Sequence, residues 1–403
     1  MAIYLIGNLV FPNSDRRLNV VGTTPTGVAA MSPLNVLVIG AGVAGTATAI
    51  LLAERGIDVD LVDVKPDVSA LGSGITLQGN ALRVLRDLGV WDEARSHGYC
   101  FDTLGFRAPD GTLLAELPDA RTGGEDLPAT MGMYRPTLAR ILLERAASLG
   151  VKARFGVCVH ALDQDDTGVT ATFDDQTNGR YGLVVGADGL RSWTRAHIGI
   201  DVEPQSTGMG IWRVFAPRPE SVTRTDLTYG GTCYIAGYCP TGQDTLYAYL
   251  VEDAQDRSAL TPDEALETMR TLAADYHGPW DDIRAGMTDT SRINYTRFES
   301  HVVDGPWHRG RVVLIGDAAH SCPPTLAQGA AQALEDAAVL ADVVGKHHDL
   351  DDVMWQEFTD RRLERAKTVV DSSVQLGRWM LDHEQGDVPG LMHRIGAMLT
   401  IPA

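Results

Sequence analysis

The 403-residue sequence has no hydrophobic run that approaches the ~20 apolar residues of a membrane-spanning helix. Its five cysteines, Cys100, Cys158, Cys233, Cys239 and Cys322, form no C-x-x-C pair and show no zinc-ligand spacing. Basic residues are few, 34 against 53 acidic ones, which gives a net charge of −19. We therefore predict no membrane segment and no metal site. We also predict no nucleic-acid partner, because a negative protein is repelled by nucleic acid. Unpaired cysteines favour reduced thiols in a cytoplasm.

The N-terminal segment also lacks the marks of a signal peptide. Residues 1–30 contain neither a charged leading region nor a compact apolar core. Met31-Ser32-Pro33 directly precedes the first predicted strand and offers an alternative start. We therefore expect residues 1–32 to be a disordered extension, of which the first 30 residues are dispensable. Loss of folding or of cofactor binding on deletion of residues 1–30 would contradict this expectation.

A dinucleotide-binding pattern begins at the first apolar run. Leu34–Ile39 predicts a buried strand, the next six residues read GAGVAG, and an apolar helix follows to about Arg55. Val59–Val62 predicts a second strand that ends at Asp63, 18 residues after Gly45. This order of strand, glycine-rich turn, helix, strand and acid is typical of a Rossmann-like unit that binds a dinucleotide.

Each residue type in this pattern has a physical role. Gly40 permits the tight turn, Gly42 lets a pyrophosphate approach the backbone, and Gly45 lets the helix pack closely on the strand. Asp63 would accept hydrogen bonds from the hydroxyls of adenosine ribose. The alternative, a glycine-rich turn without a ligand, fits the complete pattern less well.

Residues 311–338 predict a second ligand-binding unit, which also consists of a strand, a turn and a helix. Arg311–Ile315 predicts a strand buried on both faces, and Gly316-Asp317 leaves a carboxylate at the edge where that strand ends. Pro323-Pro324 fixes an extended turn, and an Ala-rich helix begins at Gln328-Gly329. The acid can accept from hydroxyls, and the helix start offers free N–H groups. Together they predict a site for an oxygen-rich ligand.

The other segments predict a second, strand-rich region and several helices. Asp110-Gly111 is a hairpin turn signal between two short apolar runs. The remaining expected elements are a glycine loop and helix in 72–90, helices at 137–149, 262–275 and 351–383, an antiparallel ribbon in 151–186, and aromatic-rich strands in 208–216 and 229–251.

Three stretches together resemble the single-component FAD-dependent aromatic hydroxylases related to para-hydroxybenzoate hydroxylase. They are GAGVAG at 40–45 with Asp63, GADGLRSWTR at 186–195, and GDAAHSCPPTLAQGAAQALEDA at 316–337. The resemblance covers nearly all of residues 34–383, and the set of three is far more specific than any single motif. One departure is Ala327, where many members of the family have glycine.

The resemblance implies an α/β fold with a Rossmann-like FAD-binding domain of the glutathione-reductase type. It implies an inserted, mostly antiparallel β-sheet domain for the substrate and a long C-terminal helix. The expected boundaries are 33–105, 130–198 and 297–345 for the FAD-binding domain, 106–129 and 199–296 for the substrate domain, and 346–403 for the C-terminal helical segment.

The resemblance also implies roles for individual residues. Gly40, Gly42 and Gly45 would hold the FAD pyrophosphate, Asp63 the ribose, and Asp317, with Gly316, the ribityl chain. Most members have Glu at the position of Asp63. Arg135 would reach the FAD linker, although a solvated surface arginine fits its spacing equally well. The remaining implied contacts are those of Asp188 with FAD and NAD(P)H, of Gly329, Ala330 and Ala331 with the flavin ring, and of the Pro324 loop with the substrate.

The implied reaction uses NAD(P)H and O2 to hydroxylate a phenolic, hydroxybenzoate-like or hydroxypyridine-like substrate through a flavin C4a-hydroperoxide. Catalytic candidates besides Pro324 are Arg213, Tyr234 and Tyr247, which come from the second region. Tyr247 and Tyr249 alternate onto one face of a strand. The tyrosines, with Tyr238 among them, could instead be core residues, and Arg213 could anchor a substrate carboxylate or form a structural salt bridge.

Two other functions remain open from the sequence. One is a flavin-dependent epoxidase or tailoring oxygenase that acts on a larger natural product. The other is a flavin-binding protein without turnover. His320 is expected to be structural, Cys322 to be a buried inert thiol, and the protein to be a monomer or homodimer.

Overall fold

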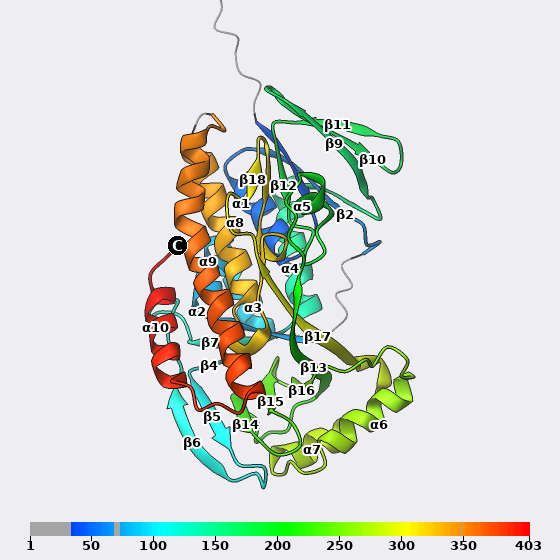
Figure 1. Ribbon diagram of the computed structural model, residues 1–403, viewed down its shortest axis with the longest axis vertical. Helices are drawn as coiled ribbons and strands as arrows, with labels where there is room; N and C mark the ends of the chain where they lie inside the picture. The colour runs from blue at the N-terminus through cyan, green and yellow to red at the C-terminus, as the bar shows by residue number, and fades with distance from the viewer. Residues whose placement is uncertain (1–33, 68–72, 348) are drawn as a thin grey trace, which may run out of the picture. The chain divides into compact units, whose positions relative to one another are not determined.

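The computed structural model describes residues 34–67, 73–347 and 349–403 (Figure 1). The predicted extension of residues 1–32 lies outside the described residues. Residues 34–403 belong to one compact unit. Among the described helices, none is both long and apolar enough to cross a membrane.

A six-stranded sheet forms the first layer of the structure. Its order is β18-β19-β12-β1-β2-β8, and only β18 runs antiparallel to its neighbour. Its strands are β1 (Asn35–Ile39), β2 (Asp58–Asp63), β8 (Lys152–Phe155), β12 (Leu183–Gly186), β18 (His308–Arg309) and β19 (Val312–Leu314). The apolar runs of β1, β12 and β19 are continuous because these strands are buried on both faces.

Different elements cover the two faces of this sheet. Val36 and Val38 of β1 belong to a core with α1 and α8, whereas Leu37 and Ile39 pack toward the antiparallel ribbon β9–β11. The covering elements are α1 (Val43–Glu54), α4 (Arg135–Ser148), α8 (Gly329–Lys346), β9 (Val159–Asp165), β10 (Gly168–Phe173) and β11 (Asn178–Tyr181). The predicted ribbon in 151–186 is therefore present, although β8 within it belongs to the main sheet.

An eight-stranded sheet forms the second layer, in the order β20-β17-β13-β16-β15-β14-β5-β6. All neighbours are antiparallel except β14 and β5. Its strands are β5 (Thr103–Arg107), β6 (Leu113–Pro118), β13 (Gln205–Pro217), β14 (Thr225–Tyr229), β15 (Ile235–Pro240), β16 (Thr245–Asp253), β17 (Ile293–Val302) and β20 (His320–Ser321). The Asp110-Gly111 turn joins β5 to β6 as predicted.

One face of the eight-stranded sheet is closed by two helices. Trp212 and Val214 of β13 pack with Met269 of α6 (Pro262–Leu272) and with Trp280 of α7 (Pro279–Gly286). Thr261 caps α6 through a reciprocal capping box with Glu264, which the sequence pattern predicts. The opposite face, with Arg213, is therefore left to meet the rest of the molecule.

A small sheet of β3 (Gly74–Gln78), β7 (Thr130–Tyr134) and β4 (Tyr99–Phe101) contacts β15 of the eight-stranded sheet and the helices α4 and α8, which cover the six-stranded sheet. The prediction of a glycine loop in 72–78 is wrong for residues 74–78. These residues alternate between buried and half-buried positions and pair with β7 along their whole length. The run is only five residues long and begins at a glycine, so its strand signal is weak.

The remaining helical elements come from several parts of the chain. The long α9 (Asp352–Leu381) runs beside α8 (Figure 1). The other helical elements are α2 (Gly79–Asp87), α3 (Trp91–His97), α5 (Trp193–His197), α10 (Val388–Thr400), η1 (Thr290–Arg292), η2 (Gly316–Ala318) and η3 (Pro324–Leu326). The predicted domain boundaries remain predictions. Two strands of the eight-stranded sheet cross them: β5 begins at residue 103, before the predicted boundary at 106, and β17 extends to residue 302, beyond the predicted boundary at 296.

Candidate active site

Packing requires two of the glycines in the turn between β1 and α1. Gly40 has φ +106°, and a Cβ there would collide with the carbonyl oxygen of Ala187. A Cβ at Gly45 would collide with the carbonyl oxygen of Gly40. These glycines let β1, α1 and the end of β12 approach one another closely.

Gly42 differs from its two neighbours in the motif. It is exposed, its φ of −73° suits any residue, and a Cβ there would have no heavy atom within 4 Å. It is the N-cap of α1, which has no side-chain cap and no acid in its first turn. Free N–H groups and open space beside them fit a pyrophosphate.

Asp63 is fixed against the same turn. Its Oδ2 accepts from the backbone N–H of Ala41 at 2.8 Å, and its Oδ1 accepts from that of Lys65 at 2.8 Å. Each carboxylate oxygen keeps a second lone pair. Asp63 can therefore still accept hydrogen bonds from a ribose, as predicted. Its side chain, which is shorter than the Glu of most family members, is held in place by backbone N–H groups.

Gly316 and Asp317 follow β19 where the sheet ends. Gly316 has φ +57° and lies against Ala44 and Ala333, where a Cβ would be 3.0 and 3.3 Å from theirs. The Asp317 side chain is solvent-accessible and accepts no hydrogen bond from the described residues. The surrounding protein nevertheless raises the pKa of the Asp317 carboxyl, and the positive charge of Arg135 partly opposes this.

Arg135 begins α4 and is exposed, and no carboxylate in the described part of the chain pairs with it. Its charge lowers the pKa of both Asp317 and Arg213. It therefore lies near the predicted ribityl acid and near the second sheet. This placement supports a contact with the cofactor rather than a purely solvated side chain.

The loop before α8 carries the other predicted flavin contacts. Pro324 is exposed at the start of η3, and Thr325 Oγ1 holds this turn to α9 through the Ser373 carbonyl at 2.6 Å. Ala327 has φ +53°, a conformation that favours glycine. Of the residues that open α8, Gly329 and Ala330 are half-buried and Ala331 is buried, and α8 has no side-chain cap.

Residues 186–195 contact the turn at Gly316–Ala318. Asp188 accepts from Ser192 Oγ at 2.5 Å and from the Thr194 N–H at 2.8 Å, so it holds the start of α5, whose N-cap is Ser192. The buried Arg195 donates to the carbonyl of Ala318 at 2.9 Å. A direct contact of Asp188 with a nucleotide stays a prediction.

Aromatic and basic side chains gather on the open face of the eight-stranded sheet. Arg213 and Phe215 lie across from Tyr249 and Tyr247 in the antiparallel register. The two tyrosine rings are stacked with centroids 5.4 Å apart, as their predicted shared face requires. Phe215 contacts the ring of Tyr134 at 4.3 Å, so this face meets the small sheet.

Arg213 is half-buried on this face and donates to the Thr296 hydroxyl at 2.8 Å. No carboxylate of the described chain pairs with it, so the structural salt bridge considered above is not formed there. Burial lowers the pKa of Arg213 to about 10. The side chain remains a cation at neutral pH, and its other N–H groups are available to a ligand.

Tyr247 shares a hydrogen bond of 2.8 Å with Thr76 of β3. Burial raises the pKa of Tyr247 and that of Tyr249 above their ordinary value. Both phenols are therefore neutral at physiological pH and act through hydrogen bonds. The sequence analysis missed the contact with Thr76, because the segment around Thr76 was expected to be a loop rather than a strand.

Strand β3 joins this face to the loop before α8. Thr76 and Gln78 point to the same side, about 7 Å apart at ~3.3 Å per residue. Gln78 Oε1 accepts a hydrogen bond from Gln328, which precedes Gly329. The predicted flavin contacts and Tyr247 thus flank one short strand.

The structure does not bring Tyr234 into this group. Its hydroxyl donates to Asp253 at 2.8 Å, six residues beyond Tyr247 on β16 and about 20 Å along the strand. Its catalytic role stays a prediction without a supporting contact. Tyr238 faces the closed side, where it is buried and donates to Asp226 at 2.7 Å. Cys322 is half-buried rather than buried as expected, and desolvation by the surrounding protein raises the pKa of its thiol to about 12.

Comparison with known proteins decides the family. The family described as FAD binding domain matches residues 33–373. The chain belongs to this FAD-binding family. The 2-heptyl-3-hydroxy-4(1H)-quinolone synthase of Pseudomonas aeruginosa is 32% identical over 354 residues, which cover 86% of this chain and 90% of that protein. The 6-hydroxynicotinate 3-monooxygenase of Bordetella bronchiseptica is 29% identical over 363 residues, covering 87% and 93%.

Solved structures show the same fold. Klebsiella pneumoniae HpxO, complexed with FAD and uric acid, aligns with a TM-score of 0.76 at 22% identity, covering 91% of this chain and 92% of that one. The tetrameric form of 2-methyl-3-hydroxypyridine-5-carboxylic acid oxygenase aligns with a TM-score of 0.75 at 24% identity, covering 88% and 94%. The predictions of the family, the fold, the FAD cofactor and an NAD(P)H-dependent aromatic hydroxylase are therefore confirmed.

The open space at Gly42 leads to a first prediction. In Gly42→Val the free energy of unfolding should fall by no more than about 1 kcal/mol, because a Cβ there meets no heavy atom and the remaining cost is the loss of glycine at the N-cap. FAD affinity should fall by roughly 100-fold or more, a loss of ~2.7 kcal/mol, because the side chain blocks the backbone. Thermal unfolding of the apoprotein and FAD titration measure the two effects. Gly40→Val is the contrast and should not fold; Gly42→Val with normal flavin content would refute the placement.

The free carboxylate of Asp317 leads to a second prediction. Asp317→Ala should weaken FAD binding about 10- to 100-fold, since a charge-assisted hydrogen bond is worth ~1.5–3 kcal/mol. Fluorescence titration of apoprotein with FAD measures this. Asp304→Ala is a matched control, because Asp304 pairs with Lys367 at the surface. Equal FAD affinities for the two variants would contradict the predicted ribityl contact.

Proposed function

We propose that this monooxygenase hydroxylates a small phenolic, hydroxybenzoate-like or hydroxypyridine-like ring that Arg213, Tyr247 and Tyr249 hold on the eight-stranded sheet. The observation that carries the proposal is the half-buried Arg213 guanidinium, which has no carboxylate partner among the described residues. A buried cation without a counter-charge is costly unless a ligand supplies an acceptor. A substrate carboxylate or phenolic oxygen would supply one.

The neighbouring side chains fit a flat ring with an oxygen substituent. The stacked rings of Tyr247 and Tyr249 offer an apolar wall, and Phe215 lies beside them. The hydroxyl pair of Thr76 and Tyr247 can donate to or accept from a ring hydroxyl. Relatives support this class by name, since one acts on 6-hydroxynicotinate, a hydroxylated pyridine that carries a carboxylate.

The bound cofactor supplies hydride acceptance from NAD(P)H and the activation of O2. The protein orients the substrate ring, holds its hydroxyl and keeps water away. Arg213 and the Thr76–Tyr247 pair serve the first two purposes, and the aromatic wall serves the third. The positive charge of Arg135 acts on both Asp317 and Arg213, and so it complements an anionic cofactor and an anionic substrate.

The predictions of a cytoplasmic location and of a monomer or homodimer are kept as part of this proposal. All five cysteines are unpaired, which supports a reducing compartment. The epoxidase or tailoring oxygenase of a larger substrate is the second candidate, and the non-catalytic flavoprotein is the third.

A substrate panel tests the proposal directly. NAD(P)H oxidation is measured with phenols, hydroxybenzoates, hydroxypyridines and hydroxyquinolines, while hydroxylated product and hydrogen peroxide are assayed together. We expect strong stimulation by one class, coupled to formation of its hydroxylated product. Stimulation only by bulky polycyclic compounds would favour the second candidate. No stimulation by any compound would favour the third.

Arg213 leads to a third prediction. Arg213→Met should raise KM for an anionic substrate about 10- to 100-fold, since a hydrogen bond to a charged group is worth ~1.5–3 kcal/mol. FAD content should stay normal, because Arg213 lies on the substrate face. Steady-state kinetics and the flavin spectrum measure both quantities. Arg297→Met is the control, because Arg297 is exposed on the neighbouring strand β17. Equal KM values for the two variants would leave Arg213 structural.

A further inference from the structure

A buried carboxylate holds the turn that precedes Asp317. Asp336 of α8 is fully buried, and its Oδ2 accepts from the backbone N–H of Gly316 at 2.7 Å and from His320 Nε2 at 2.7 Å. Its Oδ1 accepts from Arg362 Nε at 2.7 Å. All three donors converge on one side chain that faces no solvent.

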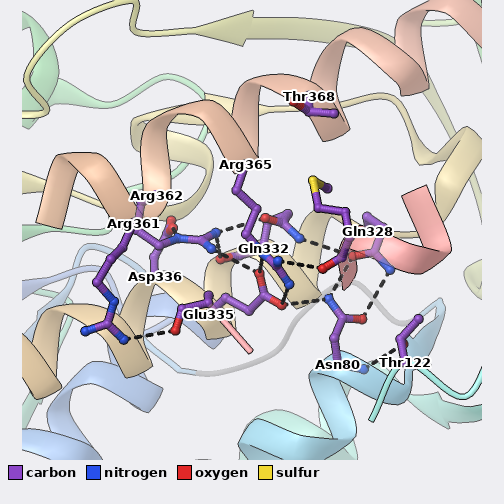
Figure 2. Close-up of polar contacts among 12 residues, drawn as sticks. Asn80, Thr122, Gln328, Gln332, Glu335, Asp336, Arg361, Arg362, Arg365 and Thr368 are labelled. Atoms are coloured by element: carbon purple, nitrogen blue, oxygen red, sulfur yellow. Dashed lines mark hydrogen bonds and ion pairs between the residues drawn. The ribbon is translucent and has the colours of Figure 1, made fainter. Parts of the chain in front are cut away.

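Arg362 brings a charge from α9 into the same place. It is fully buried and also donates to Glu335 Oε2 at 3.0 Å and to Gln332 Oε1 at 2.9 Å (Figure 2). One guanidinium thus binds three residues of α8 in different directions, which its rigid fork permits and a lysine does not. Arg365 pairs with both oxygens of Glu335, at 2.7 and 2.8 Å.

A second arm leads from Glu335 to the loop before α8. Asn80 Nδ2 donates to Glu335 Oε1 and to Gln328 Oε1, both at 3.0 Å (Figure 2). Asn80, Gln328 and Glu335 are all buried. Gln328 directly precedes Gly329. The two ends of this network are therefore the Gly316-Asp317 turn and the Gln328-Gly329 turn, which flank the predicted flavin.

Stability alone is a poor reason for such a network. Taking two arginines and two carboxylates out of water is unfavourable, and apolar residues of similar volume often stabilise a core equally well. What apolar residues cannot do is bind the N–H of Gly316 and orient Gln328 at the same time. Fully satisfied polar networks fix one arrangement of the groups that they join.

We propose that Arg362 is a positioning residue for the cofactor: through Asp336 and Glu335 it sets the spacing of the two turns that contact FAD. The proposal rests on the placement of FAD against Asp317 and Gly329. Arg362 touches neither the cofactor nor the substrate. Its contribution is the geometry of backbone groups, which should appear in FAD affinity and in the share of reducing equivalents lost as hydrogen peroxide.

Arg362→Lys tests this, because it keeps the charge and loses the three-way contact. We expect about a tenfold or larger rise in the FAD dissociation constant, the factor that corresponds to one lost charged contact. Amide exchange in the apoprotein should become faster in residues 313–331 and stay unchanged in β14 and β15. The peroxide share at saturating FAD should rise. Arg361→Lys is the matched control, because Arg361 pairs with Asp342 and the Ala403 carbonyl outside the network.

A destabilised variant separates positioning from stability. Phe358→Leu removes core volume from the same helix and leaves every network contact in place. With both variants measured at equal distances below their melting temperatures, Arg362→Lys should lose FAD affinity and Phe358→Leu should not. Equal losses would overturn the proposal.

If Arg362→Lys does not fold, Asn80→Ala removes the direct link from Glu335 to Gln328 and leaves only the 3.3 Å bond from Gln332 Nε2 to Gln328 Oε1. Faster exchange confined to residues 324–331, with weaker FAD binding, would support positioning; unchanged exchange and affinity would overturn it. Asp317→Ala separates a failure of the positioning role of Arg362 from a failure of the FAD placement. Weak FAD binding in Asp317→Ala with normal binding in Arg362→Lys defeats the positioning role alone, whereas normal binding in both defeats the FAD placement.

Discussion

The Asp336 carboxylate is the contact on which the cofactor side of the structure depends. Gly316 adopts a left-handed conformation that brings it against Ala44 and Ala333, and so ties β19 to α1 and α8. Only small residues fit at this meeting point. The Asp336 carboxylate satisfies the Gly316 N–H, which would otherwise be buried without a partner. The turn that aims Asp317 toward solvent is therefore specified by a charge buried behind it.

The face proposed to bind the substrate depends on a different element, the short strand β3. It pairs fully with β7, and through Thr76 and Gln78 it contacts both the eight-stranded sheet and the loop before α8. In the proposed arrangement, two residues of one strand therefore set the distance between a substrate on the sheet and a cofactor at the loop. The pairing of β3 with β7 along its whole length holds these two residues at a fixed spacing.

Local patterns predicted much of this structure. The βαβ unit, the capping box of α6 and the shared face of Tyr247 and Tyr249 each depend on residues that are close in sequence. Alternation assigns residues of one strand to a face and says nothing of Tyr234, which precedes a different strand. Strand β3 was missed because five residues that begin at a glycine carry little signal. The pairing of Asp336 with Arg362, 26 residues apart on two helices, depends on how α8 and α9 pack, which neither helix encodes alone.

The glycine-rich turn that begins the fold comes early in the chain, yet the guanidinium of Arg362, which contacts Asp336 behind the Gly316 turn, comes from α9. On the ribosome, the turn at residues 40–45 emerges long before Arg362. We therefore expect a nascent chain that stops before α9 to hold the cofactor poorly, even with every glycine of the first motif in place. Flavin incorporation then becomes a late step of biosynthesis, and a full complement of FAD reports that α8 and α9 have packed together.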